Sequence, residues 1–231
     1  MDAGSPITSG TWETVRSSAD VALTGMERVI DSERDAFAAC RPPGHHAARE
    51  YMGGYCYLNN AVVTTECCLS RGAERVAILD VDFHHGNGTQ NIFYDRVDVF
   101  FASIHGAPSV SYPYFSGFAD EKGVGNGEGF NANYPLPRCT LWDTFSVALA
   151  DAIKRVQAHQ PEFLVISLGV DTFEHDPISH FRLTSNNFIQ MGEAIANAGT
   201  PTLFVMEAGY MVDEIGINAV NTLQGFDSLT R

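Results

Sequence analysis

Continuous apolar runs that end in ionisable residues are the feature that most constrains the fold of this 231-residue chain. Four of them, at 36–40, 76–81, 163–169 and 202–206, have strand length and lack the apolar–polar alternation of half-exposed strands. Strands that read as unbroken apolar stretches are buried on both faces, as in a parallel sheet covered by helices. The sequence therefore predicts an α/β fold, with helices on both faces of a parallel sheet.

The segments between these runs complete an alternating pattern of strands and helices. We expect a further strand over 99–104 and helices over 11–30, 58–70, 141–158, 186–198 and 214–223. Gly86 and Gly88 predict a sharp turn. Residues 106–140 are rich in Gly, Pro and Tyr and predict a long loop region, which in a compact domain is usually functional. The chain has no internal repeat and no linker-like break, which predicts a single domain over 1–231.

Composition and charge exclude several classes of protein. The chain has 28 acidic and 14 basic side chains, for a net charge of −14, which argues against a nucleic-acid-binding surface. The acidity suits a cationic substrate, although net charge also serves solubility. No apolar run approaches the roughly 20 residues that span a bilayer, and no signal peptide is predicted. The five cysteines include no CxxC pair, so we expect a cytoplasmic protein with reduced thiols.

Polar side chains follow the apolar runs at the point where each strand ends. The four runs lead, in order, into His45 and His46; Asp82, His84 and His85; Asp171; and Glu207 with Tyr210. In open α/β sheets, ligands bind outside the carboxyl ends of the strands. Four strands that deliver ionisable groups to one edge therefore predict a functional site there.

The segment LDVDFHH indicates a metal site at this edge. Asp82 and His84 are separated by one residue, so in an extended segment both side chains point to the same side. With Asp171 they make two carboxylates and one imidazole, which leaves a fourth position open, as a hydrolytic zinc requires. Asp82 and His84 could instead cap the following turn, but Asp171 and the histidine pair favour a metal. His45 and His46 would then supply the base and acid that a metal-bound water and a leaving amine need.

Several residues keep more than one interpretation on spacing alone. Asp80 could hydrogen-bond a histidine, bind a monovalent cation, or accept hydrogen bonds from backbone N–H groups. Tyr210 could donate a hydrogen bond to a developing oxyanion or pack at the rim. The loop aromatics could line a narrow tunnel or cover the core; these are Tyr55, Tyr112, Tyr114 and Phe115.

Six sequence blocks in order resemble the zinc-dependent histone deacetylase superfamily, and most closely its bacterial acetylpolyamine amidohydrolases. The blocks are RPPGHHA, GGYCYLNNAV, ILDVDFHHGNGTQNIFY, SIHG, ISLGVDTFEHDPIS and EAGY. The resemblance runs from about Gly10 to Gly225. It implies an arginase/deacetylase-type fold and the hydrolysis of acetylated amines, such as acetylpolyamines or acetyl-lysine, to acetate and a free amine.

The resemblance also implies roles for the residues that match the family's motifs. His46 would act as general base and then general acid, and His45, held by Asp80, would assist electrostatically. Zinc would be bound by Asp82, His84 and Asp171.

Further roles concern the substrate and a second cation. Tyr210 would polarise the substrate carbonyl, Asn87 would orient His46, and Tyr55 and Tyr112 match tunnel-wall aromatics. A structural potassium ion would be held through side chains and backbone carbonyls of Asp80, Asp82, His84 and Ser103.

The chain departs from the family's pattern in two ways. Relatives are usually longer, with an N-terminal segment that forms one wall of the substrate tunnel and, in the acetylpolyamine enzymes, contributes acidic residues. We therefore expect a single deacetylase-like catalytic domain over 1–231 without that segment, with a wider tunnel and a sheet edge that another subunit of a homo-oligomer could cover. The polyamine preference is not implied. Ala208 stands where relatives commonly have glycine, which would restrict movement of Tyr210.

Three other functions compete with that of a deacetylase. A wider site could cleave esters or bulkier acyl groups. An arginase-like manganese hydrolase is disfavoured because DVDFHH has fewer carboxylates than that family's pattern. A weakly active binding or assembly subunit is disfavoured by the complete set of polar residues at the strand ends.

Overall fold

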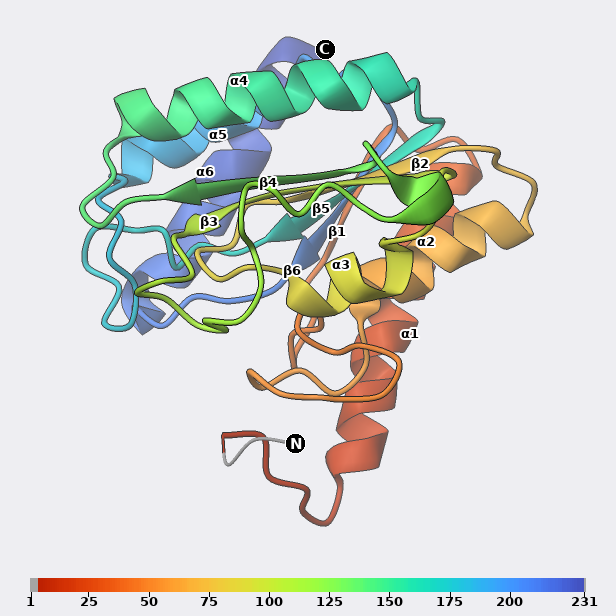
Figure 1. Ribbon diagram of the computed structural model, residues 1–231, viewed down its shortest axis with the longest axis horizontal. Helices are drawn as coiled ribbons and strands as arrows, with labels where there is room; N and C mark the ends of the chain where they lie inside the picture. The colour runs from red at the N-terminus through yellow and green to blue at the C-terminus, as the bar shows by residue number, and fades with distance from the viewer. Residues whose placement is uncertain (1–3, 231) are drawn as a thin grey trace.

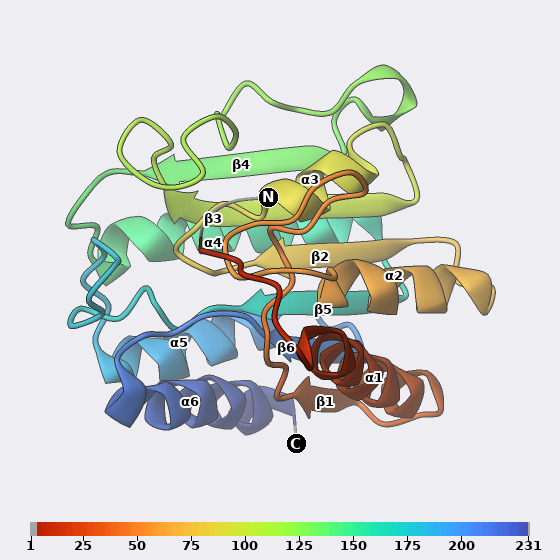
Figure 2. The same ribbon diagram turned by 90° about the horizontal axis from the view of Figure 1, so that it is seen from below.

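The computed structural model describes residues 4–230, which are organised around a six-stranded parallel sheet (Figure 1). Its strands are β1 (Asp35–Ala38), β2 (Val76–Asp80), β3 (Val99–Gly106), β4 (Asn131–Leu136), β5 (Phe163–Leu168) and β6 (Thr202–Met206). Figure 2 shows them side by side in the order β1-β6-β5-β2-β3-β4, and every neighbouring pair is parallel. The predicted fold class is confirmed.

Helices cover both faces of this sheet (Figure 1). One face packs against α1 (Thr11–Ile30), α2 (Asn60–Ser70) and α3 (Asn87–Phe93). The other packs against α4 (Trp142–His159), α5 (Ser185–Ala196) and α6 (Val212–Thr230). None of the helices in the described part of the chain is long and apolar enough to cross a membrane.

The unbroken apolar character of the strands follows from these two layers. In β2, Ala77 and Leu79 belong to the core under α4, α5 and α6, whereas Val76 and Ile78 belong to the core under α1, α2 and α3. All four side chains are 0% exposed. Since neither face of the strand meets water, neither set of alternating positions has to be polar.

Two elements depart from the sequence expectation. A sixth strand, β4, lies inside the predicted loop region 106–140, and a short helix, α3, follows the predicted turn at Gly86. β4 gives no apolar signal because Asn131 and Asn133 are buried through hydrogen bonds of their amides to Oε1 of Gln90, at 3.0 and 2.8 Å.

The carboxyl ends of the central strands meet at one edge of the sheet, as the parallel arrangement requires. Asp80, the last residue of β2, pairs in register with Ser103 of β3 and with Ser167 of β5. At the far side of the sheet, β1 pairs only with β6 among the strands of residues 4–230.

Candidate active site

Three predicted metal ligands come together beyond the ends of β2 and β5. Asp82 and Asp171 are 0% exposed and His84 is 9% exposed. One potential ligand atom from each lies within 4.8 Å of those from the other two. Gly169 permits this approach, because a Cβ at that position would lie 2.2 Å from Oδ2 of Asp82.

The two carboxylates use their oxygens unequally, because one oxygen of each accepts hydrogen bonds and the other accepts none. Oδ1 of Asp82 accepts from the backbone N–H of His84 at 2.8 Å, and Oδ1 of Asp171 accepts from that of Phe83 at 2.8 Å. The two Oδ2 atoms are buried and, among the described residues, accept no hydrogen bond. Oδ2 of Asp171 lies 2.9 Å from Nδ1 of His84. Buried carboxylate oxygens that accept no hydrogen bond are costly, and two of them beside an imidazole nitrogen fit a divalent cation.

The electrostatics of this group also favour a positive charge. Burial and the neighbouring Asp171 raise the pKa of Asp82 to about 7. Burial lowers the pKa of His84, but its contacts with Asp171 and Asp82 outweigh this effect and raise that pKa to about 9. Both shifts have the same physical cause, which is negative charge concentrated where water does not reach.

The two adjacent histidines differ in charge because their ring partners differ. Nδ1 of His45 lies 3.0 Å from Oδ2 of Asp80, and Nε2 of His45 lies 3.8 Å from Oδ1 of Asp82. Burial lowers the pKa of His45, but the two aspartates outweigh it and raise that pKa to about 10. His46 instead pairs through Nδ1 with Oδ1 of Asn87 at 2.6 Å, and burial followed by the charge of His45 holds its pKa well below the ordinary value. These shifts favour a positive charge on His45 and a neutral ring on His46.

Asp80 fulfils two of the three roles that its position left open. Its Oδ1 accepts from the backbone N–H of Asp82 at 3.1 Å, while its Oδ2 pairs with His45. Ser103, its neighbour in register, directs Oγ to Nδ1 of His105 at 2.9 Å.

Glu207 holds the loop that carries the histidine pair. Its Oε2 accepts from the backbone N–H groups of Gly44 and His45, at 2.7 and 3.1 Å. Its Oε1 accepts from Oγ of Ser167 at 3.0 Å. The side chain is buried, so these hydrogen bonds replace the water that would otherwise solvate the carboxylate. The sequence places Glu207 at this edge but assigns it no role.

Tyr210 is anchored through its backbone, since its N–H donates to Oδ2 of Asp176 at 2.8 Å. Burial, followed by the nearby Asp82 and Asp171, raises the pKa of its hydroxyl far above the ordinary value. The hydroxyl therefore stays protonated and can act as a hydrogen-bond donor.

Aromatic side chains from two loops surround the site. The ring of Tyr112 stands edge-on to His46 at a centroid distance of 4.9 Å, and Tyr55 lies 6.1 Å from Tyr210. Tyr55 has φ 66° and is 47% exposed, so it does not cover the core. Tyr114 and Phe115 are both exposed by more than half, and the ring of Tyr114 lies 6.3 Å from that of Tyr112.

Comparisons with known proteins agree with this arrangement. The histone deacetylase domain matches residues 2–226. The chain is 60% identical over all its 231 residues to acetylpolyamine amidohydrolase 2 of Pseudomonas aeruginosa, of which it covers 67%. It is 53% identical over 96% of its length to the acetylpolyamine amidohydrolase of Mycoplana ramosa, of which it covers 65%.

The structural comparison extends the likeness to the fold. The chain matches the crystal structure of the acetylpolyamine aminohydrolase from Burkholderia pseudomallei with a TM-score of 0.96 and 41% identity, over 99% of this chain and 66% of that one. It thus spans about two thirds of the length of these relatives. The predicted resemblance and fold are confirmed, and the chain belongs to the histone deacetylase family.

Proposed function

We propose that this chain carries the active site of a zinc-dependent amidohydrolase that removes acetyl groups from amines, with acetylpolyamines as its substrate class. The observation that carries the proposal is a pair of buried carboxylate oxygens that accept no hydrogen bond, on Asp82 and Asp171, beside His84 and next to two histidines whose rings have different partners. The names of the relatives, acetylpolyamine amidohydrolases, support the substrate class, and the net charge of −14 suits a cationic substrate.

Zinc is the metal that this donor set suits best. Two carboxylates and one imidazole, with a position left open, are the donor types of catalytic zinc sites, where the metal supplies a Lewis acid and an acidified water. An arginase-type pair of manganese ions would need a second carboxylate-rich group. Within residues 4–230 the other cluster of ligand atoms is His45, Cys56 and Glu207, which has a single carboxylate. A structural potassium ion beside Asp80 and Ser103 remains part of the proposal.

The residues of this chain divide the work of amide hydrolysis. His46 accepts a proton from the attacking water and later donates it to the departing amine, so that acetate and a free amine result. His45, held as a cation by Asp80, stabilises negative charge that develops nearby without losing its own proton. Tyr210 donates a hydrogen bond to the oxyanion that forms on the acetyl carbonyl.

The test combines turnover and metal content on one purified sample. We expect hydrolysis of acetylpolyamines to exceed that of acetyl-lysine peptides and simple esters, to stop on chelation, and to return with zinc. His46→Gln should lower kcat by at least about 100-fold. His175→Gln is the control, because this histidine is exposed and its ring packs against Phe173.

Two results would contradict the proposal. One is full activity in a metal-free preparation. The other is a folded, zinc-loaded protein that turns over none of the three substrate classes.

The five free cysteines suit a reducing compartment, and we therefore include a cytoplasmic location in the proposal.

A further inference from the structure

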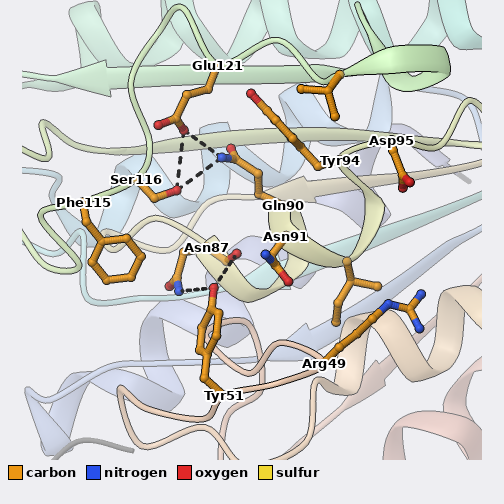
Figure 3. Close-up of a pocket in the computed structure, with 12 residues that line it drawn as sticks. Arg49, Tyr51, Asn87, Gln90, Asn91, Tyr94, Asp95, Phe115, Ser116 and Glu121 are labelled. Atoms are coloured by element: carbon orange, nitrogen blue, oxygen red, sulfur yellow. Dashed lines mark hydrogen bonds between the residues drawn. The ribbon is translucent and has the colours of Figure 1, made fainter.

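Asn87 makes hydrogen bonds from both ends of its side-chain amide. Oδ1 accepts from Nδ1 of His46 at 2.6 Å, and Nδ2 donates to the hydroxyl of Tyr51 at 3.1 Å. The Tyr51 hydroxyl in turn donates to the backbone carbonyl of Asn87 at 3.4 Å. Figure 3 shows Tyr51 and Asn87 facing each other with both bonds drawn.

The pair formed by His46 and Asn87 does not by itself select one arrangement. A neutral imidazole carries its proton on either ring nitrogen, and an amide turned by 180° exchanges its acceptor for its donor with little change of shape. In one arrangement Nδ1–H of His46 donates to Oδ1 of Asn87, which leaves the lone pair on Nε2. In the other, Nδ2 of Asn87 donates to Nδ1, which puts the proton on Nε2. Only the first leaves Nε2 able to accept a proton from water.

Tyr51 removes this ambiguity. Its single hydroxyl proton is engaged with the backbone carbonyl of Asn87, so the oxygen presents only lone pairs to the amide. The amide must then direct Nδ2 toward Tyr51 and Oδ1 toward His46. The backbone N–H of Asn87 donates to the carbonyl of His85 at 2.8 Å, so the backbone of Asn87 is held in place as well as its side chain.

The surroundings of Tyr51 allow its hydroxyl to be removed without disturbing the core. Tyr51 is half-buried and lines a cavity of about 830 Å³ together with Arg49, Asn91 and Phe115 (Figure 3). Water that enters in place of the hydroxyl donates as readily as it accepts, so it would not choose between the two amide orientations.

We propose that Tyr51 is a positioning residue that sets the tautomer of the general base His46 through the side-chain amide of Asn87. The proposal rests on the function proposed above, in which His46 takes the proton of the attacking water. Tyr51 touches neither the reacting atoms nor the metal ligands, and its effect passes entirely through Asn87.

The test is a double-mutant cycle in the zinc-loaded protein. Tyr51→Phe should lower kcat about tenfold and leave KM and the melting temperature unchanged. Asn87→Asp replaces the amide by a carboxylate, both ends of which only accept, so the tautomer no longer depends on Tyr51. In that background, Tyr51→Phe should change kcat by less than about twofold.

A spectroscopic readout separates this proposal from the proposed function. In [15N]histidine-labelled protein, the resonances of His46 are those lost in His46→Gln. They should report a proton on Nδ1 in the wild type and a mixture of both tautomers in Tyr51→Phe. This result would stand even if no acetylated amine were turned over. A proton on Nε2 in the wild type, or an equal loss of kcat from Tyr51→Phe in both backgrounds, would overturn the proposal.

Discussion

Removal of the Glu207 carboxylate should destabilise the protein far more than its conversion to an amide. In Glu207→Ala, two buried backbone N–H groups, of Gly44 and His45, lose their acceptor, and Ser167 loses the partner of its hydroxyl. An unsatisfied buried donor costs about 1–3 kcal/mol, and a bond to a charged acceptor contributes about 1.5–3 kcal/mol. Because the loop can relax in part, we expect a loss of about 4 kcal/mol in the free energy of unfolding.

Glu207→Gln keeps the shape and most of the bonds. The amide oxygen can accept from the N–H groups of Gly44 and His45, and the amide nitrogen can donate to Oγ of Ser167. What is lost is the charge, so we expect the free energy of unfolding to fall by only about 1 kcal/mol. The difference of about 3 kcal/mol between the two variants measures the hydrogen bonds rather than the charge.

The assay is urea unfolding followed by circular dichroism, on both variants with equal metal content. Glu50→Ala serves as the control, because Glu50 is exposed on the segment that follows the same histidines, and its change should stay within about 0.5 kcal/mol. The turnover of Glu207→Ala should fall in kcat, since the loop that holds His45 and His46 loosens. The reasoning is refuted if Glu207→Ala destabilises no more than Glu207→Gln or Glu50→Ala.

Further predictions concern three glycines. Gly169→Ala places Cβ 2.2 Å from Oδ2 of Asp82, so the purified variant should hold much less zinc per chain after dialysis than the wild type; equal zinc content would contradict the geometry. Gly192→Ala, in α5, places Cβ 1.9 Å from the carbonyl oxygen of Thr222 in α6 and should lower the free energy of unfolding by about 2 kcal/mol. Gly216→Ala, with no atom within 4 Å of the new Cβ, should raise it by about 0.5–1 kcal/mol, and a change of the same sign in both variants would show the helix packing to be wrong.

The fold could be predicted where buried segments consist of apolar residues. β2 reads as a strand because both of its faces are covered. β4 does not, because its buried side chains include Asn131 and Asn133. These two side chains are buried through hydrogen bonds to Gln90 and not through apolar contacts. The short helix α3 is not predicted because Gly86 caps it and Gly88 lies in its first turn, and such closely spaced glycines indicate a turn rather than a helix.

The candidate site divides in the same way. The group of Asp82, His84 and Asp171 could be predicted because parallel strands end at one edge and spacing fixes the side to which each residue points. The contributions of Glu207 and Tyr51 could not, because their partners include backbone groups, of Gly44, His45 and Asn87. Nearly every residue carries the same backbone N–H and carbonyl, so the sequence does not show which of them a side chain will contact. Such contacts become visible only in the folded structure.

The polar residues of the candidate site and the aromatic residues around it lie on different parts of the fold. Asp82 and Asp171 lie two and three residues after the ends of β2 and β5 and are buried, whereas Tyr55 and Tyr114 are exposed on loops and have φ values of 66° and 68°. Replacing a loop alters which acyl compound reaches the site without shifting the groups that react. Such an arrangement lets a family diversify in substrates while one reaction is retained, and it makes these loops, rather than the strand ends, the part of this protein to redesign for a new substrate.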